Sequence, residues 1–390
     1  MVALPLLVLV VALVLGVPIA VALAASGMLG IYLVTGDASK VMGILSLAPF
    51  STVADYALTT IPMFILMAFF SASSGLARDL YAAASNWCSH IKGGLAIATI
   101  FACGIFGAMS GASTAAASVM SKIAMPEMRR HGYSDELAAG AIGVGATLDI
   151  LIPPSIAMVI YGIATQTSIG KLLIAGVVPG IIAGILLAVM VYLWVVISPK
   201  HAPSTYRVSA QERWASLVRI WPMLILLVLV LLYTGIATPT EVGALGALLA
   251  GVIGAVFGRL TFAEAIDAVK STIRTSAMIF LILLGATIFG YYMALSRIPQ
   301  EVVTAVTAMN LNRWVVIIGI VVAYFVISMF MEGLVFPPVG LVAFIVSATA
   351  GVDLMKVYKG TSILMLSIVI TTVLLMIFPQ IALWLPATMR

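Results

Sequence analysis

Two breaks inside long apolar stretches constrain the fold of this chain more than any other feature. The first, at residues 108–114, is a run of small and hydroxyl residues, and the second, at residues 145–155, contains Pro153 and Pro154. Neither proline can donate to a helical hydrogen-bond ladder, and Pro154 also disfavours the α conformation at Pro153. In a bilayer such backbone persists only where it is buried in protein or lines a wet cavity. The breaks therefore predict a site at membrane depth, where free carbonyls and half-helix ends can hold an ion.

The composition shows which environment these breaks belong to. The 390 residues are 63% hydrophobic and 8% charged, whereas a soluble domain carries about 25% charged residues. The apolar runs are long, unlike the short alternating segments of a β-barrel. We therefore predict an all-α polytopic membrane protein. The two cysteines and three histidines show no metal-binding or catalytic spacing, so we expect no enzymatic activity and no cofactor.

Segment lengths predict a re-entrant hairpin followed by a broken helix. The hairpin is expected at about residues 93–126, because each arm is shorter than the roughly 20 residues that a membrane span needs. Its tip falls at residues 110–113. Residues 137–164 are then expected to cross the membrane as a helix broken at Pro153.

Similar breaks in the second half of the chain predict an internal repeat. The sequence Pro153-Pro154-Ser155 is matched by Pro337-Pro338-Val339, and such repetition is typical of secondary transporters. We assign residues 1–198 to a first inverted repeat and residues 221–390 to a second. The linker at 199–220 is basic and amphipathic, which predicts a cytoplasmic segment lying on the membrane surface.

Four longer motifs resemble the large membrane subunit of TRAP transporters. They are residues 107–118, 147–161 (TLDILIPPSIAMVIY), 237–244 (ATPTEVGA) and 378–386 (FPQIALWLP). The resemblance implies an inverted-repeat, elevator-type transporter that takes up an organic acid, such as a C4-dicarboxylate or sialic acid, with Na⁺ as the coupling ion. It also implies two protein partners, a small four-helix membrane subunit and a soluble extracytoplasmic substrate-binding protein. The expected location is a bacterial or archaeal cytoplasmic (inner) membrane, with lipid contacts and no nucleic-acid partner.

The second half departs from the family pattern. Met109 precedes Pro153 by 44 positions, whereas Glu332 is followed almost at once by Pro337. Family members carry the second arm of a hairpin and half of the next helix at this point. Roughly 35 to 40 residues, an arm and a half-span, are therefore expected to be absent after about Leu334. This gap affects the expected second ion site and the outer gate.

A sodium and substrate site is predicted at the two first-half breaks, because hydroxyl and carbonyl oxygens suit a hard cation. The ion is expected near Ser110, Ser113, Gly145 and Thr147, and half-helix N-termini nearby would favour a carboxylate. Small residues at the tip are also compatible with plain close helix packing. The full predicted set is Ser110, Gly111, Ala112, Ser113, Thr114, Gly145, Thr147, Leu148, Asp149, Pro153, Pro154 and Ser155.

Other candidates keep two interpretations each. Asp149, where the family motif more usually has glycine, is either an ion-coupling or proton-sensing group, or a water-facing or neutral structural one. Glu241 either resembles a functional family residue or caps a helix. A channel or passive pore and a non-transporting remnant remain alternative functions. The predicted second-half site comprises Thr238, Thr240, Glu241, Met331, Glu332, Gly333, Pro337 and Pro338.

Overall fold

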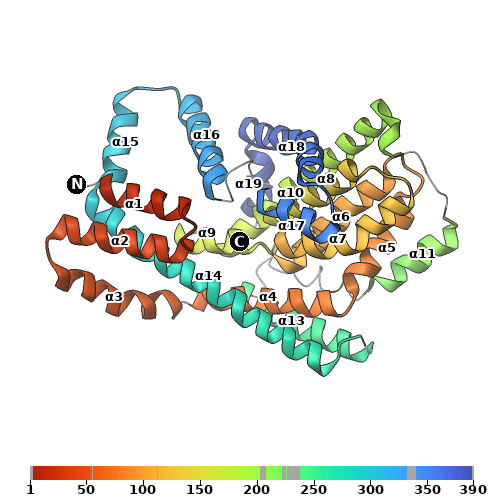
Figure 1. The fold of residues 1–390 in the computed structure, drawn as a ribbon, viewed down its shortest axis with the longest axis horizontal. Coiled ribbons are helices and arrows are strands. Elements are labelled where there is room, and N and C mark those ends of the chain that lie inside the picture. The colour runs from red at the N-terminus through yellow and green to blue at the C-terminus, as the bar shows by residue number, and fades with distance from the viewer. Residues whose placement is uncertain are drawn as a thin grey trace. The chain divides into compact units, whose positions relative to one another are not determined.

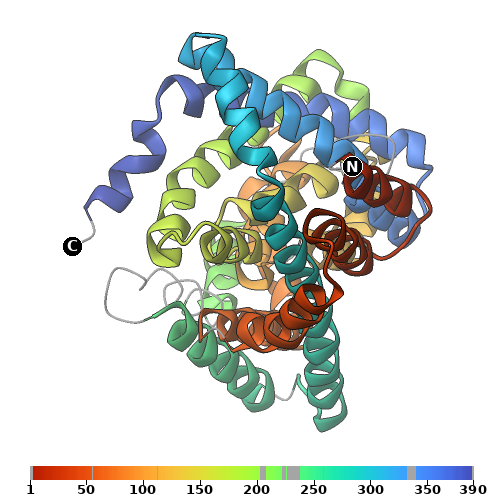
Figure 2. The ribbon, with the colours of Figure 1, turned by 90° about the vertical axis from the view of Figure 1, so that its left-hand side faces the viewer.

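The computed structural model describes residues 3–54, 56–111, 113–202, 208–221, 225, 238–257, 259–331 and 340–388 (Figure 1). Within these residues all regular structure is helical, which confirms the predicted all-α fold. The chain divides into two compact units, residues 1–59 with 273–337 and residues 60–272 with 338–390. Figure 2 shows the same helices from a second direction.

Several described helices are long and apolar enough to cross a membrane, as a polytopic protein requires. They are the combined helix at Tyr56–Ser73, α10 (Ile169–Ile197), α13 (Pro239–Val256), α14 (Phe262–Ser296) and α18 (Leu354–Ile377). The 29-residue α10 is the most apolar, with a mean hydropathy of 2.7 over its best window. The chain is therefore a multi-pass helical membrane protein.

The first compact unit contains α1 (Ala3–Val14), α2 (Ile19–Thr35), α3 (Ala38–Val53), most of α14, α15 (Ile298–Ala308) and α16 (Arg313–Met331). Its core gathers Ile31 and Ala48 with Ile288 and Tyr292 of α14. Gly30 leaves the space that the Tyr292 ring occupies, so α2 can approach α14 closely.

The second unit contains the hairpin, the broken helix and the linker. Its helices are α4 (Thr60–Ser73), α5 (Leu76–Cys88), α6 (Gly94–Ser110), α7 (Ser113–Arg130), α8 (Asp135–Ala146), η2 (Thr147–Ile150), α9 (Ile156–Ala164), α10, η3 (Pro199–His201), α11 (Ala210–Arg219), α13, the start of α14, α17 (Gly340–Ala350), α18 and α19 (Gln380–Ala387). Every residue of α8 from Leu137 to Ala146 is buried. Its small residues allow close approach: a Cβ on Gly140 would lie 2.6 Å from the carbonyl carbon of Gly360 in α18, as in other membrane helix pairs.

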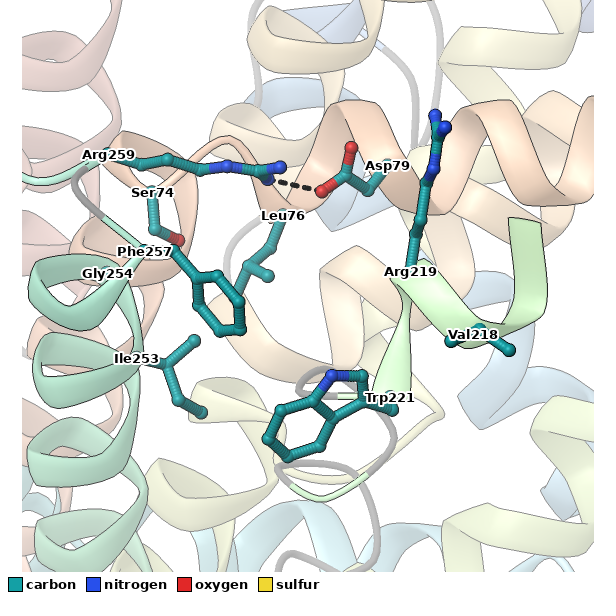
Figure 3. Close-up of a pocket in the computed structure, with 10 residues that line it drawn as sticks. All are labelled: Ser74, Leu76, Asp79, Val218, Arg219, Trp221, Ile253, Gly254, Phe257 and Arg259. Atoms are coloured by element: carbon teal, nitrogen blue, oxygen red, sulfur yellow. Dashed lines mark hydrogen bonds and ion pairs between the residues drawn. The ribbon is translucent and has the colours of Figure 1, made fainter. Parts of the chain in front are cut away.

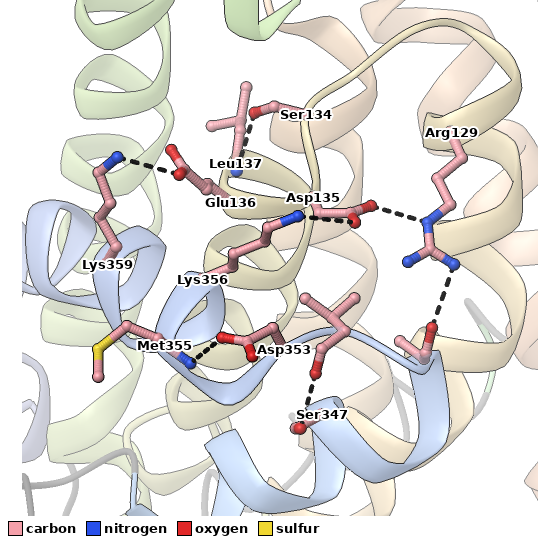
Figure 4. A network of polar contacts seen from close by, with 12 residues as sticks. Arg129, Ser134, Asp135, Glu136, Leu137, Ser347, Asp353, Met355, Lys356 and Lys359 are labelled. Atoms are coloured by element: carbon pink, nitrogen blue, oxygen red, sulfur yellow. Dashed lines mark hydrogen bonds and ion pairs between the residues drawn. The ribbon is translucent and has the colours of Figure 1, made fainter.

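Ion pairs join the ends of these helices outside the apolar core (Figure 4). Arg129 at the end of α7 lies 2.7 Å from Asp135 at the start of α8, and it donates a 3.2 Å hydrogen bond to the carbonyl of Ala350 in α17. Lys359 of α18 pairs with Glu136 at 3.0 Å. The Arg129 contacts hold the C-terminal end of the hairpin arm α7 against α8 and α17, and the Lys359 pair joins α8 to α18.

The linker contains an amphipathic helix, as its sequence predicts. Helix α11 begins with a capping box in which Ser209 and Glu212 satisfy each other's backbone N–H groups. It packs on α5: the Trp87 indole N–H donates to the carbonyl of Arg213 at 3.2 Å, and the Trp87 and Trp214 rings meet edge to face at 5.8 Å. Residues 203–207 of the linker lie outside the described residues.

Candidate functional site

The predicted hairpin tip lies where α6 ends and α7 begins. Helix α6 ends at Ser110, and Gly111 takes a left-handed conformation with φ 59° while its N–H bonds the Gly107 carbonyl at 2.7 Å. This is the usual glycine ending of a helix, and it lets the chain reverse before Ser113 starts α7. Ala112 and the side chain of Ser110 lie outside the described residues. Thr114 lies in the first turn of α7.

The predicted broken helix is interrupted over a longer stretch than its prolines alone require. Helix α8 ends at Ala146, Thr147 and Leu148 enter a 3₁₀ turn, and α9 begins only after Ser155. The Ser155 hydroxyl caps α9 by accepting from the Met158 N–H at 3.3 Å. The Thr147 hydroxyl donates to the Val144 carbonyl at 2.7 Å, which leaves the lone pairs of that hydroxyl available to a cation.

Glycines bring the hairpin against this break. A Cβ on Gly107 would lie 2.6 Å from the Cβ of Asp149, and a Cβ on Gly111 would lie 3.2 Å from the Pro154 carbonyl oxygen. Gly145, on the helix before the break, likewise faces α6, where a Cβ would lie 3.1 Å from the Cα of Ile100. The structure therefore places the tip beside Asp149, Pro154 and the start of α9, although these residues are about 40 positions apart in sequence.

Asp149 is buried in this contact rather than facing water. The residue is 2% exposed, and its Oδ1 atom has no hydrogen-bond partner among the described residues. Burial of a carboxylate that has one oxygen without a partner is costly, which favours a protonated or cation-bound group. This burial does not fit the water-facing interpretation, whereas the neutral structural one and the ion-coupling one both fit the geometry.

An apolar groove of about 230 Å³ lies between α6, the broken helix and α10. Its lining includes Phe101, Leu148, Ile152 and Ile181. Because these side chains offer no hydrogen-bonding group, the groove has no chemistry for an anion. The polar groups of the candidate site lie instead at the hairpin tip and on the backbone of the break.

In the second half, Glu241 serves as a helix cap. Its carboxylate accepts from the Thr238 N–H at 2.7 Å, and the Thr238 hydroxyl accepts from the Glu241 N–H at 3.3 Å, which closes a capping box at the start of α13. The Thr240 hydroxyl lies 2.7 Å from that of Thr60 in α4. Met331 ends α16, and its side chain, together with Glu332, Gly333, Pro337 and Pro338, lies outside the described residues.

Two residues with contacts at the predicted sites were not among the predicted site residues. Gly107 belongs to the 107–118 motif but not to the predicted site, yet its lack of a side chain leaves the space that Asp149 occupies. Thr60 is the first residue of the apolar helix α4, and nothing in the sequence indicates its contact with Thr240. For the contact between Gly107 and Asp149, the only sign in the sequence is a small residue about one helical turn before the tip.

Comparison with known proteins identifies close similarity along most of the chain. Residues 6–336 match the family model described as "Tripartite ATP-independent periplasmic transporter, DctM component". The chain is 33% identical to a C4-dicarboxylate TRAP transporter large permease protein of Pseudomonas aeruginosa, over 93% of this chain and 92% of that protein. It is 29% identical to an ectoine TRAP transporter large permease protein of Halomonas elongata, over 96% of each chain. A sialic acid TRAP transporter large permease protein of Vibrio cholerae is 27% identical over 85% of this chain and 86% of its own length.

These alignments also contain gaps in this chain. The alignment with the Pseudomonas protein has 400 positions but takes in 93% of 390 residues, about 363, so gaps occupy about 37 positions. The Halomonas alignment has 412 positions and takes in 96%, about 374 residues, which leaves about 38. These totals do not assign the gaps to a position, so the absence of 35 to 40 residues after about Leu334 stays a prediction. The expected junction falls within 332–339, outside the described residues.

Proposed function

The chain belongs to the DctM family of tripartite ATP-independent periplasmic transporters, and we propose that it is the permease subunit of a sodium-coupled importer of organic acids. In this proposal it works by an elevator motion with a small four-helix membrane subunit and a soluble substrate-binding protein. It lies in a bacterial or archaeal inner membrane, with the basic linker at 199–219 in the cytoplasm. Membership of a transporter family argues against an enzymatic role.

The observation that carries sodium coupling is the contact between the hairpin tip and the broken helix. Gly111 approaches the Pro154 carbonyl, and α8 gives way at Ala146 to a 3₁₀ turn, where the Val144 and Gly145 carbonyls accept from the Thr147 N–H. The Thr147 hydroxyl is available beside them. Carbonyl and hydroxyl oxygens are the ligands that a hard cation prefers, and broken helices at membrane depth hold coupling ions in other transporters.

The proposed substrate is an organic anion such as a C4-dicarboxylate or sialic acid. Helix α7 begins at the hairpin tip, at Ser113, and α9 begins after the break, following Ser155. The N-terminal ends of both helices favour negative charge. The relatives named above for C4-dicarboxylate, ectoine and sialic acid transport have similar identities to this chain. Overall similarity therefore does not select one cargo among them.

The test is thermal stability of the purified chain in Na⁺ and in K⁺ at equal ionic strength. A ligand that binds only the folded protein at 100 times its Kd adds about 2.7 kcal/mol of stability. We expect a Na⁺-specific rise in Tm that shrinks in Ser113→Ala and Thr147→Val. Thr99→Val is the matched control, because Thr99 is buried in α6 and its hydroxyl also donates to a backbone carbonyl, that of Leu95, at 2.8 Å.

Equal Tm values in Na⁺ and K⁺ would remove sodium coupling from the proposal. The close spacing of Glu332 and Pro337 favours one other function, a non-transporting remnant, since the family pattern has a hairpin arm and half a helix between them. Uptake into vesicles that contain the assembled system separates the possibilities. A coupled transporter accumulates substrate against its gradient when Na⁺ is supplied outside, a pore only equilibrates it, and a remnant does neither.

A further inference from the structure

A cavity of about 240 Å³ in the second unit lies far from the hairpin tip in sequence and is unused by the proposed mechanism. Figure 3 shows its charged wall, formed by Asp79, Arg219 and Arg259, and its aromatic wall, formed by Phe257 and Trp221. These residues come from α5, from the end of the linker helix α11 and from the turn between α13 and α14.

The cavity lies at the level where membrane-spanning helices end. Helix α4 ends at Ser73, α13 ends at Val256 and α14 begins at Phe262, and Ser74 and Gly254 both line the cavity. A Cβ on Gly254 would lie 3.1 Å from the Cβ of Ser74, so α13 and the end of α4 are in direct contact there. The boundary between the hydrocarbon core and water is where lipid headgroups lie.

The charged wall has one positive charge in excess. The Arg259 guanidinium is paired with the Asp79 carboxylate (Figure 3), whereas Arg219 is exposed and has no ion-pair partner among the residues that the structure describes. Guanidinium groups suit phosphate because they present several N–H donors in a fixed plane. The site can therefore accept one anionic group without leaving a buried charge unpaired.

The opposite wall is apolar and aromatic. The rings of Trp221 and Phe257 meet at 6.3 Å between centroids with an angle of 66°, and Ile253 and Val218 extend the same surface. The indole nitrogen of Trp221 faces the cavity in Figure 3. Tryptophan is typical of the membrane interface, where one edge is apolar and the other is polar. A charged wall beside an apolar one fits an amphiphile better than a free ion.

We propose that this cavity binds the phosphate of an anionic phospholipid. Arg219 and Arg259 contact the phosphate, and Trp221 and Phe257 pack against the glycerol and the first carbons of the acyl chains. Basic pockets at the ends of membrane helices bind lipid headgroups in this way. Since α11 packs on α5 and supplies Arg219, the bound lipid holds the linker helix against the spanning helices α4 and α13.

The experiment measures the Tm of the full chain in detergent after lipid removal, with added phosphatidylglycerol, phosphatidylcholine or inorganic phosphate. We expect phosphatidylglycerol to raise the Tm in a saturable way, with little effect of the other two. Arg219→Gln should weaken the apparent affinity about fivefold, the usual contribution of one basic residue at an anionic membrane surface. Arg130→Gln is the matched control, because Arg130 is also exposed at a helix end and has no ion pair among the described side chains.

A second variant tests the charge argument in the opposite direction. Asp79→Asn removes the competing carboxylate, so the Tm rise with phosphatidylglycerol should occur at lower lipid concentration even if the lipid-free protein is less stable. Equal responses of the wild type and Arg219→Gln would overturn the proposal. So would equal responses to phosphatidylglycerol and phosphatidylcholine, and a matching response to inorganic phosphate would indicate an anion site that does not recognise lipid.

Discussion

Gly107 of the hairpin is in contact with Asp149 of the broken helix, and this contact leaves no room for a side chain at position 107. A Cβ there would lie 2.6 Å from the Asp149 Cβ and 3.3 Å from its Cα. The Cα is a backbone atom and the Cβ is bonded directly to it. Neither can move away as the end of a flexible side chain can. The contact therefore fixes the distance between α6 and the break on which the proposed ion site depends.

Gly107→Ala is expected to destabilise the protein by about 1–3 kcal/mol, the usual result of overpacking. This loss opposes the gain of up to about 1 kcal/mol that alanine brings in a helix. Thermal unfolding in detergent measures it. Gly290→Ala in α14 is the control, because a Cβ there has no neighbour within 4 Å, and it should leave the Tm unchanged or raise it.

The double variant Gly107→Ala with Asp149→Gly decides whether this particular contact is responsible. Removal of the Asp149 side chain makes room for the new methyl group, so the double variant should be more stable than the two separate losses predict. Strict additivity of the two changes would show that Gly107 and Asp149 do not restrict each other.

The sequence predicts the hairpin and the broken helix well because both depend on local signals. Arms too short to span, a tip of small residues and a Pro-Pro pair give α6, α7 and the α8–α9 interruption close to their observed bounds. Helix α3 has no comparable signal beyond its cap: the Asp37 side chain accepts from the Ser39 N–H at the start of a 16-residue helix.

Contacts between distant segments leave no comparable signal in the sequence. The Asp79–Arg259 pair joins residues 180 positions apart, and Gly140 meets Gly360 across two helices. Neither follows from hydrophobic periodicity, because buried helices such as α8 are apolar on every side. The orientation of these helices depends on packing, which only the folded arrangement reveals.

His201 lies outside the membrane-spanning helices, and we expect it to make the stability of the protein depend on pH. Its Nδ1 lies 2.7 Å from the Ser134 hydroxyl and 4.0 Å from the Glu136 carboxylate. Burial lowers the pKa of His201; Glu136 opposes this shift, and Lys200 and Lys359 add to it. The folded protein thus binds a proton at His201 less readily than the unfolded chain does, whose histidine pKa is about 6.5.

The sign of the effect follows from this difference in proton binding. Stability from neutral His201 is fully present above about pH 6.5 and is lost as the pH falls through the lower pKa of the folded state. We expect the Tm of the wild type to fall from pH 7.5 to 5.5 more steeply than that of His201→Asn. His90→Asn, a change at an exposed histidine, should keep the slope of the wild type, and equal slopes for all three proteins would contradict the prediction.

The capping box of α13 gives a prediction that separates a structural role of Glu241 from ion coupling. Thr238 and Glu241 satisfy each other's backbone N–H groups, so Thr238→Ala should cost about 1 kcal/mol. Glu241→Gln keeps an oxygen that can accept from the Thr238 N–H and should cost less. Ser209→Ala removes the same capping box from α11 and serves as the control for loss of a cap alone.

The Na⁺-dependent rise in Tm is the second measurement on these variants. If Glu241 is only a cap, each variant lowers the Tm by the same amount in Na⁺ as in K⁺. The hydrogen bonds that are lost belong to the folded state with or without the ion. A selective loss of the Na⁺ effect in Glu241→Gln, with the Tm in K⁺ unchanged, would contradict the capping role. It would assign Glu241 to a second ion site that depends on its negative charge, since glutamine has nearly the same shape and differs in charge.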